Sequence, residues 1–416
     1  MLRLRLPNRQ EVTALLLAGL FLLIPLDYVL PHIGSATCVT VISIAIILFG
    51  LLLIITGPKT IRLSKESKIL LFLTFVYFIS VIWAIEKSAA LSRMFPILNT
   101  FLLYIIATQF RYSKKHIRWM ENASIIGAVI LSLYVFRYID LSLVFAGYRL
   151  KFNLLGTQYF SDPNGLAGRL LFPVIILIDR VQKKQKVYMR IFYIVLLLLC
   201  AYFLLMTGSR AGMVAIMIGV FITLLQGFRN KNKWVIISVL VLTVAVYISV
   251  NYLPSHIVSR IFNFINYKSV ATVKGDRIDI WKHVFELFLR SPLVGYGGGN
   301  AGNALKEFYG YAKAVHSSYF SVLCELGLLG FVPWIVFVFR KIKAAFMLRK
   351  TNPMIFAAII SVAFMAATLD AFTEKYLWSV FIYVYIYKEA EAAELAAACE
   401  GGTENDKVID GLPGVC

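Results

Sequence analysis

About a dozen apolar segments, each near the length that a helix needs to cross a bilayer, fill most of this chain. Hydrophobic residues make up 60% of its 416 positions and charged residues only 15%, with a mean hydropathy of +0.78. A soluble domain of this length would be far less apolar. The sequence therefore predicts an all-α integral membrane protein with about 12 transmembrane helices.

The predicted spans follow the template of about 20 apolar residues per membrane-crossing helix. They lie near residues 12–30, 36–57, 69–85, 95–110, 119–136, 164–179, 191–207, 211–227, 234–251, 317–339, 353–369 and 371–387. The predicted division of the chain is helices one to nine in 1–251, a loop in 252–316, helices ten to twelve in 317–388, and a tail in 389–416. The shift of the tail to Ala, Glu and Gly predicts a short helix followed by disorder.

Lys and Arg gather in every alternate short connection, which predicts that these connections are cytoplasmic. The intervening short connections hold only isolated charges. Both termini are then cytoplasmic, and the long loop and any chemistry in it lie on the outer face. The net charge of +20 is explained by anchoring to membrane lipids, and we expect no nucleic-acid partner. The basic sets are Arg3/Arg5/Arg9, Lys59/Arg62/Lys65/Lys68, Arg111/Lys114/Lys115/Arg118, Arg180/Lys183/Lys184/Lys186/Arg190, Arg229/Lys231/Lys233 and Arg340/Lys341/Lys343/Arg349/Lys350.

The outer loop contains a predicted amphipathic helix over residues 277–290, with Ile278, Trp281, Phe285 and Phe288 spaced along one side. Such a helix would lie on the membrane surface. A glycine-rich stretch over residues 295–299 follows it. These glycines could turn backbone N–H groups toward an anion, or they could form a flexible hinge. Eight basic against four acidic residues between 252 and 315 favour a phosphate-bearing lipid substrate, or contact with lipid headgroups.

Arg210 lies between two predicted spans at the outer face, in a connection of only four residues, 207–210. An arginine beside hydrocarbon is costly unless it has a partner or a water-filled cavity. It should therefore face a cleft, where its planar fork suits a phosphate or pyrophosphate, unless it extends to the headgroups. Arg93 and Lys87, between helices three and four, are weaker candidates of the same kind.

His316 opens the tenth predicted helix at the outer interface, and Ser317 after it can cap the helix N-terminus. The helix dipole disfavours the charged imidazolium there, so a neutral ring that accepts a proton fits this position. The alternative is a polar interfacial anchor. On a continuous helix Glu325 would lie about 13 Å deeper and on the opposite side, facing the bundle interior. Gly327 and Gly330 would allow close helix packing.

No His/Cys cluster or CxxC pair indicates a metal site, so neither metal nor cofactor is expected. The five cysteines lie in or beside apolar runs or in the tail, so no disulfide is predicted.

Four segments resemble a known family of membrane glycosyltransferases. The run from His316 to Gly330, HSSYFSVLCELGLLG, is similar to the signature of bacterial O-antigen ligases and the related lipid-linked polysaccharide polymerases. TGSRAG around Arg210 and GDRIDIW leading to RSPLVGYGGG around Arg277 match in order. SDPNGLA at 161–167, with Asn164, is also of this kind. The resemblance covers about residues 160–340.

This resemblance implies a metal-independent, inverting glycosyltransferase with a GT-C-like fold in the bacterial inner membrane, active on the periplasmic face. Its donor would be a glycan linked to undecaprenyl pyrophosphate. Arg210 and Arg277 would hold the pyrophosphate, and His316 would be the base on a sugar hydroxyl. Two arginines can stabilise the leaving charge where other enzymes use a metal.

The acceptor is not fixed by these motifs. A ligase would use the lipid A–core, which the histidine motif favours, and a polymerase would use a second lipid-linked glycan. A polysaccharide flippase or transporter is a further alternative, but such proteins usually show repeat-related halves, and no repeat is visible here.

Overall fold

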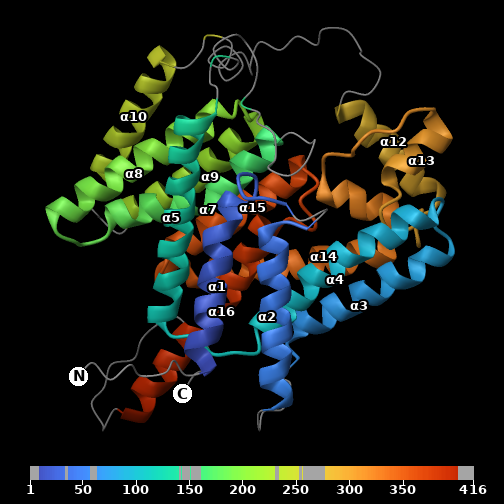
Figure 1. The fold of residues 1–416 in the computed structure, drawn as a ribbon, viewed down its shortest axis with the longest axis horizontal. Coiled ribbons are helices and arrows are strands. Elements are labelled where there is room, and N and C mark those ends of the chain that lie inside the picture. The colour runs from blue at the N-terminus through green and yellow to red at the C-terminus, as the bar shows by residue number, and fades with distance from the viewer. Residues whose placement is uncertain are drawn as a thin grey trace.

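The computed structural model describes residues 9–32, 36–56, 63–139, 161–229, 234–252 and 277–401, with residues 142, 150 and 255 as single positions. Helices make up most of this described chain (Figure 1). The predicted all-α membrane class is confirmed. Seven helices are long and apolar enough to cross a membrane, and α15 is a shorter apolar helix.

Each of the twelve predicted spans coincides with one helix of the structure. The count of twelve membrane crossings stays a prediction. The helices are α1 (Arg9–Leu26), α2 (Cys38–Ile55), α3 (Lys65–Ile79), α4 (Lys87–Ala107), α5 (Lys114–Tyr138), α7 (Pro163–Gln182), α8 (Val187–Met206), α9 (Arg210–Arg229), α10 (Trp234–Tyr252), α14 (Ser318–Met347), α15 (Pro353–Thr368) and α16 (Lys375–Gly401). Two further helices, α12 (Arg277–Arg290) and α13 (Ala301–Tyr309), belong to the predicted outer loop.

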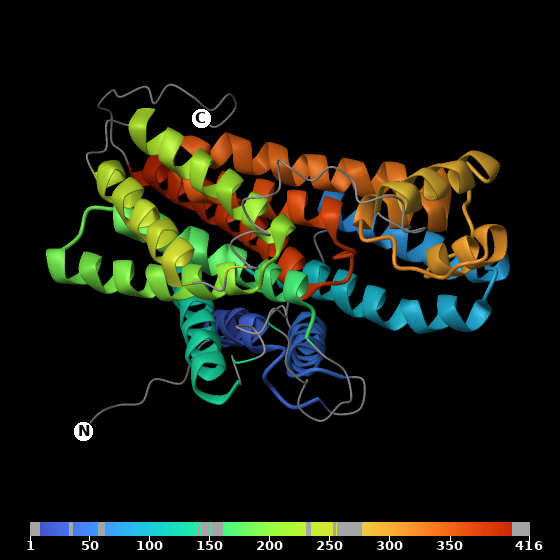
Figure 2. The same cartoon turned by 90° about the horizontal axis from the view of Figure 1, so that it is seen from above.

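The centre of the molecule is formed by α7 and the first half of α16, up to Tyr387, where the apolar side chains are almost all buried. Around α7 pack α5, α8, α9 and α15. Figure 2 shows α1, α2 and α5 nearly end-on beside a layer in which α3, α4 and α14 run lengthwise. Tilted and edge-on ring contacts join α14 to α16, between Trp334 and Phe337 on one helix and Trp378 and Phe381 on the other.

Ion pairs between distant segments follow the predicted division into two faces. Lys114 pairs with Glu391, and Arg340 with Glu66, and all four lie in or next to connections predicted as cytoplasmic. Arg93 pairs with Asp370 at 3.2 Å, and both belong to the predicted outer side. Each of these three pairs thus joins segments that the charge pattern places on the same face. Which face meets the cytoplasm stays a prediction.

The loop helix α12 has the predicted bounds. On the predicted apolar side, Ile278 is 62% exposed and Phe285 48% exposed, whereas Trp281 stacks on Phe320. A second apolar face, which was not predicted, is buried against α13 and α14 and consists of Ile280, Val284 and Leu287. The position of α12 on a membrane surface stays a prediction.

The helix α14 is interrupted at Gly327, which corrects the continuous helix assumed in the sequence; the close packing expected at Gly327 is present, against the backbone of Leu293. Gly327 has φ +55° and ψ −154°, a conformation that L side chains rarely adopt. Gly330 lies tightly against Leu326. The backbone groups released at the break are bonded by the segment after α12: Leu328 N donates to Pro292 O at 2.8 Å, and Gly297 N to Glu325 O at 2.8 Å.

The end of the chain also differs from the prediction. The tail was expected to begin at residue 389 as a separate short helix, but α16 continues through it to Gly401 without interruption. Salt bridges from Lys114 to Glu391 and Glu394 hold this extension against α5. The rest of the tail lies outside the described residues.

Candidate functional site

The start of α14 places His316 in an unusual backbone conformation. Its φ of +54° makes it the one non-glycine residue with positive φ in the described part of the chain. Strained conformations of this kind persist only where surrounding contacts enforce them, and they are common at functional sites. Ser317 caps the helix as predicted, accepting from Phe320 N, and Ser318 Oγ donates to the carbonyl of Leu369.

Arg277 and His316 are brought together by the packing of α12 on α14. One nitrogen of the Arg277 guanidinium donates to the carbonyl of Thr368 at 3.2 Å, which fixes the first turn of α12 at the end of α15. Burial, and then the positive charge of Arg277, lower the pKa of His316 below its ordinary value. Asp162 and Asp370 act in the opposite direction. The net effect keeps the ring neutral and able to accept a proton near neutral pH.

Asn164 lies beside the turn that carries Arg210. Its side-chain oxygen accepts from Ser209 Oγ at 2.9 Å, directly before Arg210 at the first position of α9. Asp162 caps α7 by accepting from the backbone N–H groups of Asn164 and Gly165. The N-termini of α7 and α9 are therefore joined side by side. Arg210 and the N-terminus of α9 supply positive charge that suits an anion, whereas the N-terminus of α7 is capped by the Asp162 carboxylate.

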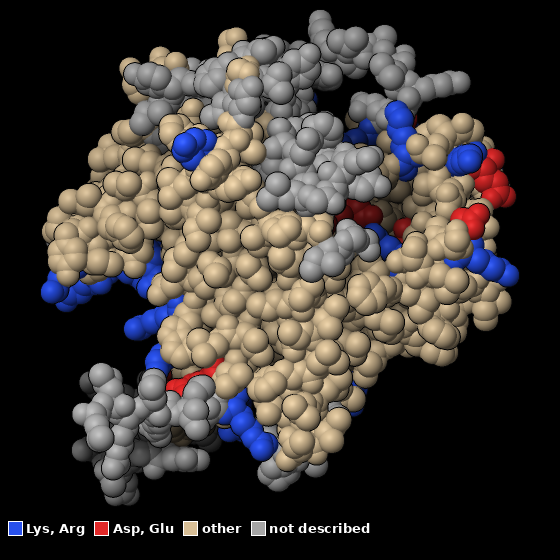
Figure 3. Space-filling view, in the orientation of Figure 1, with Lys and Arg blue, Asp and Glu red and all other residues tan. Residues whose placement is uncertain are grey.

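A cavity of about 570 Å³ opens between α4, the start of α13 and α14. Arg93 lines it and forms its ion pair with Asp370 there, whereas Lys87 is exposed at the first turn of α4 and does not line it. Val315, next to His316, lines it too. The space-filling view shows basic and acidic side chains close together in a hollow beside α12 and α13 (Figure 3).

Glu325 is 4% exposed and lines the same cavity. The backbone N–H groups of Gly299 and Ala301 point at its carboxylate. The anion bonded by the backbone at the end of the glycine-rich stretch is thus the Glu325 carboxylate of the same chain. A glycine is required at position 295, because a Cβ there would lie 2.4 Å from the Cys324 carbonyl oxygen. The predicted interior position of Glu325 is confirmed by its burial.

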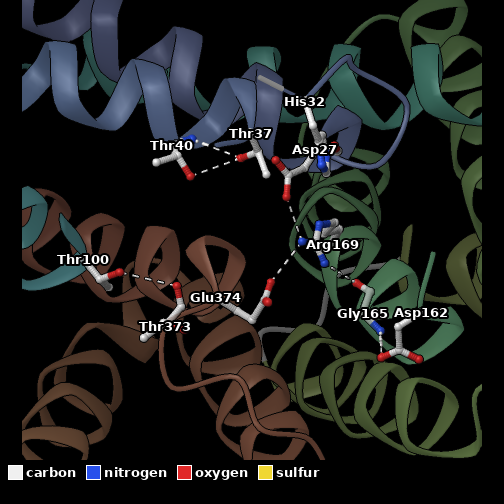
Figure 4. Close-up of polar contacts among 10 residues, drawn as sticks. All are labelled: Asp27, His32, Thr37, Thr40, Thr100, Asp162, Gly165, Arg169, Thr373 and Glu374. Atoms are coloured by element: carbon white, nitrogen blue, oxygen red, sulfur yellow. Dashed lines mark hydrogen bonds and ion pairs between the residues drawn. The ribbon is translucent and has the colours of Figure 1, made fainter. Parts of the chain in front are cut away.

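A buried ion cluster beside the site was missed in the sequence. Arg169, in the second turn of α7, is 5% exposed and bonds to Asp27 at 2.9 Å and Glu374 at 3.0 Å (Figure 4). Its guanidinium also stacks over Tyr28. Two features of the sequence could have indicated this cluster. A charged residue lies within a predicted span, and isolated acidic residues lie in the predicted outer connections.

Within the described residues no group of three or more His, Cys, Asp or Glu side chains could hold a metal ion. The available chemistry is a neutral imidazole near one arginine, a second arginine at the start of α9, and a polar cavity lined by Val315, the residue before His316. This set can bind an anion and accept a proton from a hydroxyl.

The fold and this site define a multi-pass, all-α membrane protein with a polar site built between helix ends. Residues 195–335, about a third of the chain, match the family model described as O-antigen ligase. Over this segment, the match agrees with the resemblance to O-antigen ligases seen in the motifs. The matched segment contains Arg210, Arg277 and His316. No curated protein sequence matches the chain.

Proposed function

We propose that the protein transfers a glycan from undecaprenyl pyrophosphate to a sugar hydroxyl on the lipid A–core, at the periplasmic face of the bacterial inner membrane. The family match supports a ligase or polymerase type of glycosyl transfer. The donor, the acceptor and the roles of individual residues belong to the proposal.

In the proposed step, the acceptor oxygen attacks the anomeric carbon of the donor and forms the new glycosidic bond. The bond between that carbon and the pyrophosphate oxygen breaks, and the pyrophosphate leaves with the electron pair. The hydroxyl proton passes to the His316 imidazole. Attack opposite the leaving group inverts the anomeric configuration.

The observation that carries the proposal is the position of Arg277 at the start of α12, where its charge acts on His316. Arg277 supplies positive charge for the pyrophosphate, and the same charge lowers the pKa of His316, so that the ring stays neutral and able to accept a proton. Arg210, at the joined N-termini of α7 and α9, supplies a second cation. Charge stabilisation of the leaving group by preorganised donors is a large term in such reactions, and two arginines can supply it without a metal.

The direct test uses purified protein with a lipid-linked glycan and an acceptor, in excess EDTA and without nucleotide. We expect transfer, and we expect Arg210→Lys to impair it, because lysine keeps the charge and loses the planar fork. Lys87→Ala, an exposed change on the outer side, is the matched control and should transfer normally. No transfer in EDTA that returns with a divalent cation, or normal transfer by both Arg210→Ala and Arg277→Ala, would contradict the proposal.

The same assay separates ligase from polymerase. Offered both acceptors, a ligase extends the lipid A–core, whereas a polymerase joins two lipid-linked glycans. The histidine motif favours the ligase. Vectorial movement of the donor without a new glycosidic bond would instead identify a flippase.

A further inference from the structure

The cavity between α4, α13 and α14 differs chemically from the arginine site. Its two basic side chains, Arg93 and Lys313, are matched by two carboxyl side chains, Glu325 and Asp370. Arg93 and Asp370 are paired directly, at 3.2 Å. The cavity thus offers many hydrogen-bonding groups and no excess of positive charge. It suits a neutral, hydroxyl-rich ligand better than a pyrophosphate.

The lining is also prepared for polar contacts. Asn303 orients its amide by donating to Asn300 at 3.0 Å, and Ser321 adds a hydroxyl from α14. The Arg93 Nε atom is buried without a hydrogen-bond partner among the described residues. A buried donor without a partner is costly, and a ligand that accepts a hydrogen bond would remove this cost. The volume of about 570 Å³ lies within the usual range of ligand pockets, roughly 300–1,000 Å³.

The cavity lies next to His316 along the chain and does not include Arg277. Val315 and Ala314, which precede His316, line the cavity, and so does Asp370, whose charge acts on the imidazole. Arg277 lies outside the lining and is held by Thr368 instead. A base must reach the hydroxyl of the acceptor, and the acceptor must approach away from the leaving group.

We propose that this cavity binds the sugar that bears the attacking hydroxyl, with its ring held by Asn303, Ser321 and Glu325. The assignment rests on the proposed glycosyl transfer and adds to it a separate acceptor subsite. The pyrophosphate of the donor is then bound by a different set of residues, so mutations can weaken the binding of each substrate independently of the other.

Gly302 provides a steric test. It lines the cavity from α13, and a Cβ at this position would meet only the Lys313 carbonyl oxygen, at 3.4 Å. Its φ is not in the left-handed region, so alanine fits and larger side chains extend into the open space. The series Gly302→Ala, Gly302→Leu and Gly302→Phe should raise the acceptor KM stepwise, by about tenfold or more for the larger two. The donor KM should stay unchanged.

Two further variants complete the design. Glu325→Gln keeps the shape and removes the charge, and should also raise the acceptor KM without affecting the donor KM. Glu307→Leu places a leucine on an exposed position of the same helix, outside the cavity, and should leave both constants unchanged. Slow transfer of the donor glycan to water, measured without acceptor, should persist in the Gly302 series because it does not need the subsite.

An unchanged acceptor KM in Gly302→Leu and Gly302→Phe would overturn the acceptor subsite, and so would a rise confined to the donor KM, which would place the donor glycan in the cavity. Failure of the underlying function gives a different result, namely no transfer by the unaltered protein to either acceptor. Because the unaltered protein is measured first, the two failures are distinguished.

Discussion

Arg169 and Asp27 form an ion pair of 2.9 Å between α7 and the outer end of α1. Both side chains are nearly inaccessible, with exposures of 5% and 11%. Asp162, seven residues before Arg169, caps the same helix, and Asn164 bonds to the turn that carries Arg210. The pair therefore fixes the axial position and the rotation of α7, whose N-terminus bonds to the turn that carries Arg210.

The first prediction concerns this pair. Asp27→Asn should lower the free energy of unfolding by about 1–3 kcal/mol, because the buried guanidinium loses a charged partner. Glu374→Gln should have a smaller effect, since its side chain is 34% exposed and water can replace the lost contact. Thermal unfolding in detergent micelles compares the two. Equal stability of Asp27→Asn and the unaltered protein would show that the pair does not hold α7.

The helices could be predicted well because each span is a long apolar run bounded by charges, and that pattern depends on local sequence alone. The bounds of α12 followed from its period for the same reason. Its buried face could not be predicted, because Ile280 and Ile278 are equally apolar and only the packing on α14 selects between them.

Site residues could be predicted where they lie in a sequence motif. Contacts between side chains from distant segments could not be predicted. Arg210, Arg277 and His316 lie in motifs, whereas the pairing of Arg93 with Asp370 joins positions 277 residues apart. The break at Gly327 was also hidden, because a glycine in an apolar run reads equally as a packing site. Only the neighbouring segment after Pro292 shows why the helix opens there.

The second prediction tests that break. Gly327→Ala should destabilise the protein strongly, because its Cβ would lie 2.5 Å from the backbone of Leu293 in addition to the cost of positive φ. Gly310→Ala is the matched control: it also has positive φ, but a Cβ there meets nothing within 4 Å. Its cost should be limited to about 1–2 kcal/mol of backbone strain. If the melting temperature decreased equally in the two variants, the close contact with Leu293 would not contribute to stability.

The third prediction concerns the membrane face. In a cysteine-free background, Lys306→Cys on α13 should react with an impermeant thiol reagent in intact spheroplasts. Lys184→Cys, in the basic connection after α7, should react only after lysis. Both positions are exposed in the structure, so accessibility to the reagent is limited by the membrane. The reverse labelling pattern would put the site on the cytoplasmic face.

The fourth prediction follows from the electrostatics of His316. Its pKa is lowered by burial and by Arg277, so the acid limb of the pH profile should lie below the ordinary imidazole range. Removing the charge in Arg277→Gln should raise the pKa, and the acid limb should move to higher pH. Asp370→Asn removes a group that acts in the opposite direction, so its acid limb should move to lower pH. A profile that does not move in either variant would indicate that another group titrates.

The last prediction concerns His316 as the base. Its ring is influenced by the charges of Arg277 and of Asp370, which lines the cavity, and in the proposed reaction it takes the proton of the acceptor hydroxyl. Positioned general bases contribute typically about 10²–10⁴-fold, so His316→Ala should lose turnover of that order. Binding of the lipid-linked donor should persist, because Arg210 and Arg277 remain. His316→Gly separates chemistry from backbone strain: glycine accepts the φ of +54° without cost, so equal losses in both variants would assign the effect to the imidazole. If His316→Ala instead abolished donor binding and left the turnover of bound donor unchanged, the residue would be a substrate anchor and the proton would pass to another group.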